Sequence, residues 1–380
     1  MKIRKSAQKS FIKTVRVCIL ETPLIHPFRI STGQHDSLHN VLLILRLNDG
    51  TCGFGEAAIA THITGETVES TIALLRRVAP HLKGRFIGDY HRILTELGSD
   101  LDAIPSARTA VEMALLDALT QTLNIPLWRF FGTRAERLST DITLVIADAE
   151  QTHDSVRGFV RAGFRRFKIK VGLDPASDLD RVRIVHAAAP RAGIILDANQ
   201  GFSAPAALKF LQRLARFGIR PILVEQPVHR NDWDAMRWIT RRSPSPVCAD
   251  ESLQSVADVV RIIQLGAAHA INIKLAKFGF LQSIQMAALA RASDLSLMIG
   301  SMMETNLSAT AAAHFAAGIG GFDFVDLDTP FFIPDHADQN PYLSPNGIYD
   351  LVKCASGIGI QKVSSGLRLR YFGIPRNIPS

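Results

Sequence analysis

The apolar positions in the C-terminal two-thirds of the chain form short runs that recur at a spacing of roughly 25 residues. Runs of this length are typical of buried strands, and a strand, a loop and one helix together take about 25 to 30 residues. The spacing therefore predicts repeated strand–helix units with parallel strands, which close into a barrel. The runs end at residues that are mostly acids or lysines: Val145, Lys170, Asp197, Glu225, Asp250, Lys274, Gly300 and Asp326. Because parallel barrels carry their chemistry at the C-terminal ends of the strands, this pattern predicts a catalytic barrel.

Both ends of the chain follow a different pattern. Residues 15–56 alternate like an antiparallel meander, and residues 66–130 have helical spacing, most clearly from Ala107 to Leu123. After Asp328 prolines interrupt the periodicity, and we expect this tail to return to the N-terminal region. The predicted architecture is an α/β barrel with an α+β capping domain built from both ends of the chain. The expected bounds are 1–135 for the N-terminal capping domain, 136–330 for the barrel and 331–380 for the returning segment.

Composition argues against several classes of protein. The chain has 380 residues, of which 47% are hydrophobic and 21% charged, as in an ordinary globular protein with a large core. It contains no apolar run long enough for a membrane span, and its basic N-terminus precedes no signal-like apolar segment. The net charge of +8 is spread without dense basic tracts or interleaved aromatic residues, so we expect no nucleic-acid partner. Four scattered cysteines fit a cytoplasmic protein, and we expect a homo-oligomer.

Three carboxylates, those of Asp197, Glu225 and Asp250, follow three successive strands. Any one of them alone is explained as well by a strand-end acid that caps the next helix. A cluster of three acids, however, is costly unless a cation neutralises it. Ligands that are all oxygen atoms suit Mg²⁺, so the trio predicts a magnesium site.

Lysines occupy the strand ends on both sides of this trio. Lys168 and Lys170 are two residues apart and point to the same face, which is the barrel interior. Adjacent ammonium groups beside a metal disfavour double protonation, so one lysine can be neutral near pH 7 and act as a general base. Lys274 follows four units later, across the barrel. For Lys168 alone, a salt bridge to a neighbouring acid is an equally good interpretation.

Two bases on opposite faces of one carbon are suited to a 1,1-proton transfer. A substrate carboxylate held by Mg²⁺ would become an enediolate when its α-proton leaves, and return of a proton from the other side would invert the centre. The residues proposed as catalytic are Lys168, Lys170 and Lys274.

At this point the sequence resembles the muconate-lactonizing subgroup of the enolase superfamily, from about Val15 onward. The resemblance is carried by short motifs: Lys168-Ile-Lys170, Asp197-Ala-Asn199, Glu225-Gln-Pro227, Ala249-Asp-Glu-Ser252 and Lys274, with Gly53-Phe-Gly-Glu56 and the helix 107–123 resembling the cap. The resemblance implies a modified TIM barrel of (β/α)7β type, Mg²⁺ as the cofactor and the two-lysine chemistry just described.

One further motif narrows the substrate. Asp326-Leu-Asp328 resembles the Asp-x-Asp motif at the end of the eighth strand in dipeptide epimerases, where the pair binds the α-ammonium group of the dipeptide. Two carboxylates on one face that the metal does not need also make a good ammonium site on physical grounds. A helix cap or a turn would use the same residue types. The resemblance thus implies a dipeptide substrate whose C-terminal residue is epimerised.

The loops that would contact the substrate side chains indicate its class. Epimerases of Ala-Glu that resemble this chain carry an arginine near the position of Gly33, so the glycine favours a small or apolar dipeptide. Arg29 is a possible replacement, and a solvent-facing arginine explains it equally well. Met303 and Asn199 complete the expected substrate contacts, although a methionine here is commonly a packing residue.

Other activities share the metal site and the lysines. These are N-acylamino acid racemase, o-succinylbenzoate synthase and muconate cycloisomerase, whose substrates have no free α-ammonium group, so Asp326 and Asp328 argue against them. A barrel that binds metal without catalysis would tolerate Lys170→Ala unchanged, and the presence of both bases disfavours it.

Overall fold

The computed structural model describes residues 10–30, 33–132, 137–334, 340–360 and 368–371. Side chains are described over the same ranges except at 26–30, 33–35, 62 and 368–371. None of the helices in these ranges is both long enough and apolar enough to cross a membrane.

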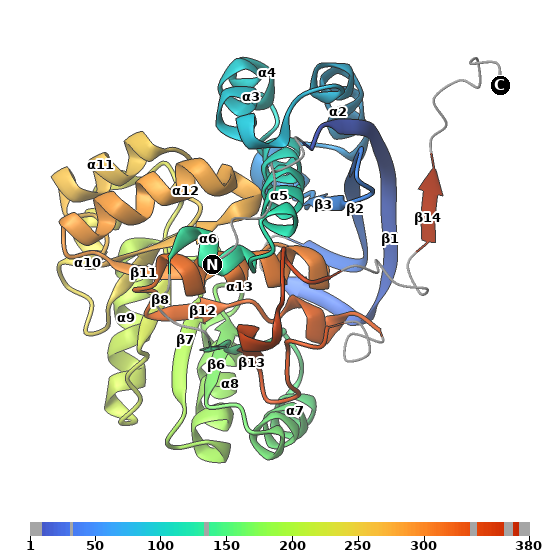
Figure 1. Ribbon diagram of the computed structural model, residues 1–380. Helices are drawn as coiled ribbons and strands as arrows, with labels where there is room; N and C mark the ends of the chain where they lie inside the picture. Colours follow the sequence, from blue (N-terminus) through green and yellow to red (C-terminus); the bar gives the residue numbers. More distant parts are fainter. Residues whose placement is uncertain (1–9, 31–32, 133–136, 335–339, 361–367, 372–380) are drawn as a thin grey trace, which may run out of the picture.

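The cap is an antiparallel sheet flanked by helices (Figure 1). Its strands are β1 (Ile12–Ile30), β2 (Gly33–Leu47), β3 (Cys52–Ala57) and β14 (Arg368–Tyr371), in the order β14-β1-β2-β3. The C-terminal strand β14 pairs with β1, so both ends of the chain contribute to this sheet. The helical part consists of α1 (Thr61–Thr64), α2 (Val68–Leu82), the 3₁₀ turn η1 (Ile87–Asp89), α3 (Tyr90–Glu96), α4 (Gly98–Leu101), α5 (Pro105–Thr122) and α6 (Leu127–Phe131).

The glycine motif of β3 follows from the closeness of β3 to helix α5. A Cβ atom at Gly53 would collide with the backbone carbonyl of Ala114, and one at Gly55 with that of Ala110. Asp117 of the same helix accepts a hydrogen bond from the Phe54 amide at 3.0 Å. The two glycines therefore let α5 lie directly on the sheet, and this packing fixes the position of the cap strands.

The second part of the chain is an eight-stranded parallel sheet. Its strands follow one another in sequence order from β5 to β12, so each strand lies beside its neighbours in sequence. The strands are β5 (Ile142–Leu144), β6 (Arg166–Lys170), β7 (Gly193–Asp197), β8 (Leu223–Glu225), β9 (Val247–Ala249), β10 (Ala270–Lys274), β11 (Ser296–Gly300) and β12 (Phe324–Asp326). The helices between them are α7 (Ala149–Ala162), α8 (Pro175–Ala188), α9 (Ala204–Arg216), α10 (Trp233–Thr240), α11 (Val256–Leu265), α12 (Leu275–Ala292) and α13 (Asn306–Ile319).

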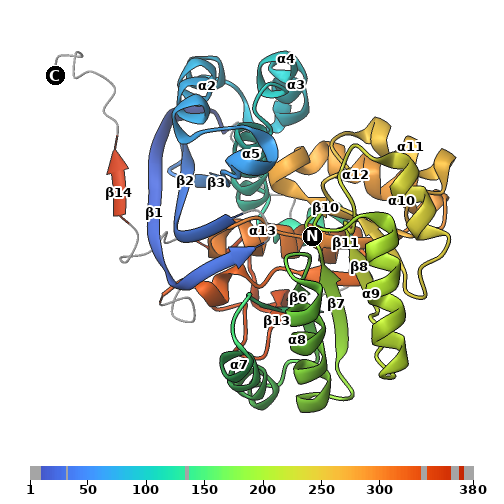
Figure 2. The same cartoon turned by 180° about the vertical axis from the view of Figure 1, so that it is seen from behind.

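The sheet curls until its first and last strands meet. The amide of Asp141, just before β5, donates a hydrogen bond to the Val325 carbonyl of β12 at 2.9 Å, and the Leu327 amide donates to the Thr140 hydroxyl at 2.8 Å. This nearly closed barrel, with the antiparallel cap on one side of it (Figure 2), confirms the predicted fold class. Outside both sheets lie β4 (Arg137–Ser139), its partner β13 (Ile348–Asp350), and the 3₁₀ turns η2 (Thr329–Phe332) and η3 (Leu351–Lys353).

The strand ends agree with the sequence pattern, with two small shifts. Lys170, Asp197, Glu225, Lys274 and Asp326 are the last residues of their strands. Strand β5 ends at Leu144, one residue before the expected Val145, and β9 ends at Ala249, so Asp250 is the first residue of the following loop.

An apolar layer closes the barrel beneath these strand ends. It is formed by five fully buried residues, Ile195, Leu223, Cys248, Ala270 and Met298. Most of them precede a strand-end residue by two positions and so point to the same interior face, one layer lower. The polar residues at the strand ends therefore lie directly above a packed apolar layer.

Candidate active site

Strand register aligns the charged residues at the rim. Lys170 of β6 pairs with Asp197 of β7, which in turn pairs with Glu225 of β8. On the other side, Lys274 of β10 pairs with Gly300 and Gly300 with Asp326 of β12. Because paired residues lie level in adjacent parallel strands, their side chains meet at one height in the barrel.

Lys168 lies at the centre of this group. Its Nζ atom is 3.0 Å from Asp197 Oδ2, 2.7 Å from Glu225 Oε2 and 2.6 Å from Asp326 Oδ2. The salt-bridge interpretation of Lys168 therefore describes its contacts in this structure. The other two lysines also pair with acids: Lys170 with Asp197 at 2.7 Å and Lys274 with Asp250 at 2.8 Å.

Burial and charge shift the pKa values of this group in opposite directions. Burial raises the pKa of Glu225 to about 8, and the charge of Asp197 adds to the rise. Burial also acts to raise the pKa of Asp197, but Lys168 and Lys170 outweigh it and hold that pKa well below its usual range. The pKa of Asp250 is likewise lowered, since Lys274 and Lys277 outweigh burial.

The pKa of Lys168 is raised, opposite to the lowered value expected if Lys168 were the neutral member of its pair with Lys170. Burial lowers the pKa of Lys168, but the charges of Asp197, Asp326 and Glu225 outweigh burial and raise it well above the ordinary value. The pKa of Lys274 is also raised, since Asp250 and Glu225 outweigh its burial. The expectation rested on repulsion between ammonium groups, whereas the acids beside each lysine dominate here.

The chemistry of the acid trio fits a hard divalent cation. Asp197, Glu225 and Asp250 are at most 1% exposed and offer only carboxylate oxygens, which suit Mg²⁺. Glu251, the neighbour of Asp250, is buried, and its Oε2 has no hydrogen-bond partner in the part of the chain that the structure describes. So much buried negative charge at one rim calls for positive charge beyond that of the lysines.

A cavity of about 610 Å³ opens above the rim, between the barrel and the cap. Lys168, Lys170 and Lys274 line its barrel side. Strands β6 and β10 are four strands apart in an eight-stranded barrel, so Lys170 and Lys274 stand on opposite walls. The geometry thus places one amino group on each side of whatever molecule the cavity holds.

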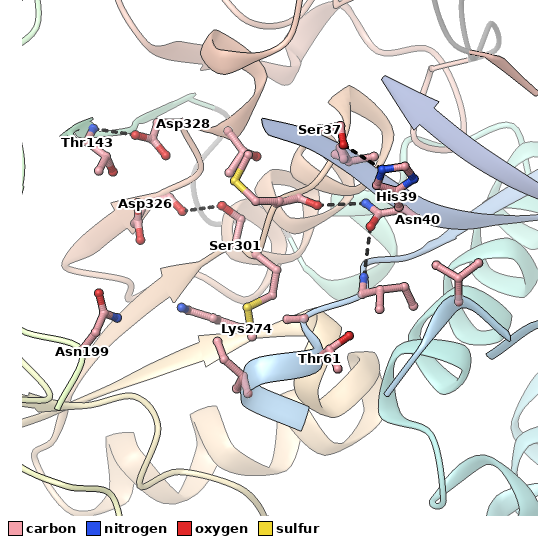
Figure 3. Close-up of a pocket in the computed structure, with 18 of the residues that line it drawn as sticks. Ser37, His39, Asn40, Thr61, Thr143, Asn199, Lys274, Ser301, Asp326 and Asp328 are labelled. Carbon is pink, nitrogen blue, oxygen red and sulfur yellow. Dashed lines mark hydrogen bonds between the residues drawn. The ribbon is translucent and has the colours of Figure 1, made fainter. Parts of the chain in front are cut away.

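Asp326 and Asp328 also line this cavity (Figure 3). Asp326 contacts Lys168, and Oδ2 of Asp328 accepts a hydrogen bond from the Thr143 amide at 2.6 Å. Burial raises the pKa of Asp328 to about 7, and the charge of Asp326 adds to the rise. Neither acid caps a helix through its side chain, which removes one alternative to a ligand-binding role.

Of the other residues expected to contact the substrate, two line the cavity and two belong to the β1–β2 hairpin. Asn199 lines the cavity and accepts a hydrogen bond from Lys170 Nζ at 3.1 Å. Met303 lines it too, and its carbonyl accepts a hydrogen bond from Asn40 at 2.9 Å. The side chain of Arg29 lies outside the described residues. The backbones of Arg29 and Gly33 belong to the β1–β2 hairpin, where Arg29 pairs with Gln34 and Ile30 with Gly33.

The cap supplies an apolar wall to this cavity. Leu38, Ile59, Ile63 and Val68 line the cavity from the cap, and Met302 and Met303 line it from the barrel. Leu38 belongs to the same hairpin as the expected loop residues, but alternation alone could not indicate that it faces a cavity rather than the core.

Two charged residues near the rim were also missed. Lys277, in the first turn of α12, places Nζ 2.6 Å from the Asp250 carbonyl and 3.1 Å from its Oδ1. Lys277 could have been found from its position three residues after Lys274, because a helix that directly follows a strand brings residues at this spacing to the same side. Asp141 lies beside Asp326 and Asp328, and oxygens of these three acids all lie within 4.8 Å of one another.

Comparison with known proteins agrees with this geometry. Residues 12–132 match the family model of the mandelate racemase/muconate lactonizing enzyme N-terminal domain, and residues 151–362 match the enolase C-terminal domain-like model. The chain is similar to a hydrophobic dipeptide epimerase of Citrifermentans bemidjiense, with 45% identity over 90% of this chain and 95% of the relative. It is similar to an aromatic dipeptide epimerase of Herpetosiphon aurantiacus, with 39% identity over 90% and 97%.

Among solved structures, one similar protein is a dipeptide epimerase from Enterococcus faecalis, complexed with Mg and the dipeptide L-Leu-L-Tyr. The TM-score is 0.86 and the identity 29%, covering 92% of this chain and 99% of that one. Family models and relatives both extend over nearly the whole described barrel and cap. The chain therefore belongs to the enolase superfamily, as a member with the mandelate racemase/muconate lactonizing enzyme domains.

Proposed function

We propose that this protein is a Mg²⁺-dependent epimerase that inverts the α-carbon of the C-terminal residue of dipeptides. The observation that carries the proposal is a single cavity with Lys170 and Lys274 on opposite walls and with Asp326 and Asp328 beside them. Two opposed amino groups suit removal of a proton from one face of a carbon and its return to the other. The relatives named as dipeptide epimerases support the same activity.

The charges of the cavity indicate how a dipeptide would lie in it. Its α-ammonium group binds Asp326 and Asp328, the two acids that line the cavity from the barrel. Its carboxylate points to the rim formed by Asp197, Glu225 and Asp250. This orientation places the α-carbon of the C-terminal residue between Lys170 and Lys274.

The acid trio would hold Mg²⁺, which supplies positive charge that stabilises the negative charge developing on the substrate carboxylate. The same acids position the bases, because Asp197 pairs with Lys170 and Asp250 with Lys274. One lysine accepts the α-proton on its side, and the other, as an ammonium group, donates a proton from the opposite side. Lys168 stays in contact with three acids and keeps the site compact.

Apolar side chains are the substrate class that the cavity favours. Ile59, Ile63 and Met302 bring hydrocarbon surface to the space between cap and barrel. Burying a leucine- or phenylalanine-sized side chain against such a wall stabilises a complex by about 1.5 to 3 kcal/mol. The hydrophobic and aromatic names of two relatives point to the same class.

We also propose a cytoplasmic homo-oligomer. Its four cysteines are free thiols, three of them buried, as is usual in a reducing compartment. Light scattering of the purified protein would measure the oligomeric state.

The test is proton exchange in D₂O. Purified protein with Mg²⁺ is incubated with Ala-Leu, Ala-Phe, Ala-Ala, Ala-Glu and Lys-Ala, and each dipeptide is read by mass spectrometry and chiral chromatography. We expect a gain of one mass unit with inversion for the apolar dipeptides, and none with Lys170→Ala or Lys274→Ala. Turnover of N-succinyl or other N-acylated amino acids, with no exchange in any free dipeptide, would overturn the proposal.

A further inference from the structure

Asp141 is a buried acid that the proposed reaction does not use. It lies at the seam of the barrel, where its amide is bound to Val325 of β12. Its side chain is 0% exposed, and among the described residues neither carboxyl oxygen has a hydrogen-bond donor as a partner. An ionised carboxylate in such surroundings is strongly disfavoured, since nothing replaces the water it has lost.

The groups that face Asp141 add to this cost. Oxygens of Asp141, Asp326 and Asp328 lie within 4.8 Å of one another, so each acid repels the others when ionised. The positive group on this side is Lys168, whose Nζ already contacts Asp326, Asp197 and Glu225. Oδ2 of Asp328 has the Thr143 amide as its donor. Asp141 is therefore left with acceptors as its neighbours.

Asp141 also differs from the other two acids in its access to the cavity. Asp326 and Asp328 line the cavity, whereas Asp141 is not among the lining residues. It stands behind the pair that would bind the ammonium group and does not touch a substrate there. Any influence on binding passes through the other two carboxylates.

We propose that Asp141 is a positioning residue that remains a neutral carboxylic acid at pH 7 and donates its O–H to Asp326. The inference rests on the proposed function, because it assigns Asp141 to the ammonium site of that same cavity. One proton held between two acceptors that would otherwise repel each other removes a charge from the cluster. It also fixes the Asp326 carboxylate, so that its free lone pairs face the cavity.

Electrostatics supports this assignment. Burial and the charges of Asp326 and Asp328 raise the pKa of Asp141 well above its ordinary value, although Lys168 opposes the rise. With Asp141 neutral, Lys168 and an incoming ammonium group face two carboxylates instead of three.

Two substitutions at Asp141, both close to aspartate in size, test whether this residue acts as a neutral hydrogen-bond donor. In D141N the amide replaces the O–H as donor to Asp326, and in D141L the shape remains but the donor is lost. With Ala-Leu as the substrate, we expect the KM of D141N within about threefold of wild type and the KM of D141L raised about tenfold or more. The kcat should change less than the KM in both. D117N is the matched control, because Asp117 is a buried acid of the cap that does not line the cavity.

Infrared difference spectra provide a readout that needs no turnover. Other buried acids such as Glu225 also contribute protonated-acid C=O bands at pH 7, so the readout is the difference between wild type and each variant. One acid C=O band should be lost in D141N at pH 7 and kept in D117N. An unchanged acid band in D141N, or a KM in D141N as high as in D141L, would overturn the inference. If wild type turns over no dipeptide, the proposed function fails, and the infrared band still decides the state of Asp141.

Discussion

The Nζ atom of Lys168 lies 2.6 Å from Oδ2 of Asp326 while it also contacts Asp197 and Glu225. One ammonium group thus connects the acids proposed to hold the metal with the acids proposed to hold the substrate. Occupancy of either site changes the charge around the same lysine, so the two sites are electrostatically coupled.

This connection predicts a large stability effect for Lys168→Met. Removing the shared partner leaves the buried Glu225 and Asp326 without their lysine and Asp197 with Lys170 alone, so we expect the free energy of unfolding to fall by about 3 to 5 kcal/mol. Lys170→Met is the control, since Lys170 forms an ion pair with Asp197 and should cost less. Urea unfolding of both variants measures the difference. Equal losses would mean that Lys168 does not hold the acids together.

Metal binding should depend on one acid cluster and not on the other. We expect Mg²⁺ to raise the melting temperature of wild type and to lose most of this effect in D197N, because a ligand stabilises the folded state only through its affinity. D328N should keep the Mg²⁺ effect, because Asp328 belongs to the cluster with Asp141 and Asp326. EDTA should abolish exchange. Loss of the Mg²⁺ effect in D328N but not in D197N would place the metal at the cluster of Asp141, Asp326 and Asp328 and would contradict this prediction.

Stability should fall with rising pH because of Glu112 in helix α5. Burial raises its pKa to about 7, so the folded state binds a proton that the unfolded state, with its ordinary pKa of 4.5, has already released. The stabilisation is complete below about pH 4.5 and is lost as pH rises through 7, by at most about 3 kcal/mol. E112Q should flatten this dependence in urea unfolding at pH 5 and pH 8. An unchanged slope would show that Glu112 is ionised throughout.

Contacts between cap and barrel should control substrate affinity. Asn40 donates to Glu56 at 2.6 Å and to the Met303 carbonyl at 2.9 Å, and accepts from the Ile59 amide at 3.0 Å. Because Ile59 and Met303 line the cavity, we expect N40A to raise the KM for Ala-Leu about tenfold and to destabilise the fold by about 1 to 3 kcal/mol.

Asn340 is the control for this prediction. It is also buried and donates to Thr310 at 2.9 Å, but it does not line the cavity. N340A should lose stability by a similar amount with little change in KM, measured by the same unfolding and initial-rate assays. A raised KM in both variants would mean that KM reports general loosening of the fold.

The repeat in the sequence predicted the site residues that end barrel strands and missed those at other positions. Lys170, Asp197, Glu225 and Lys274 were found because a strand end recurs in every barrel unit and the register aligns those ends. Asp141 precedes its strand instead of ending it, so the same rule passed it over.

Contacts between distant segments also escaped the pattern. Lys277 reaches Asp250 from the first turn of a helix, and Leu38 reaches the cavity from a cap hairpin. Their positions depend on how the cap and the barrel pack together, which neither the period of two nor the period of 3.6 encodes. The directions of the lysine pKa values could not be foreseen either, because they depend on how many acids lie within contact distance.

The opposed placement of Lys170 and Lys274 limits what such a catalyst can do for a cell. In the proposed reaction each amino group serves one stereoisomer, since the two lysines stand on opposite walls of the same cavity. A catalyst lowers the barrier in both directions alike and leaves the final ratio of isomers to their own free energies. Net conversion therefore requires another reaction that consumes one isomer, and the direction of flow is set by that consumer.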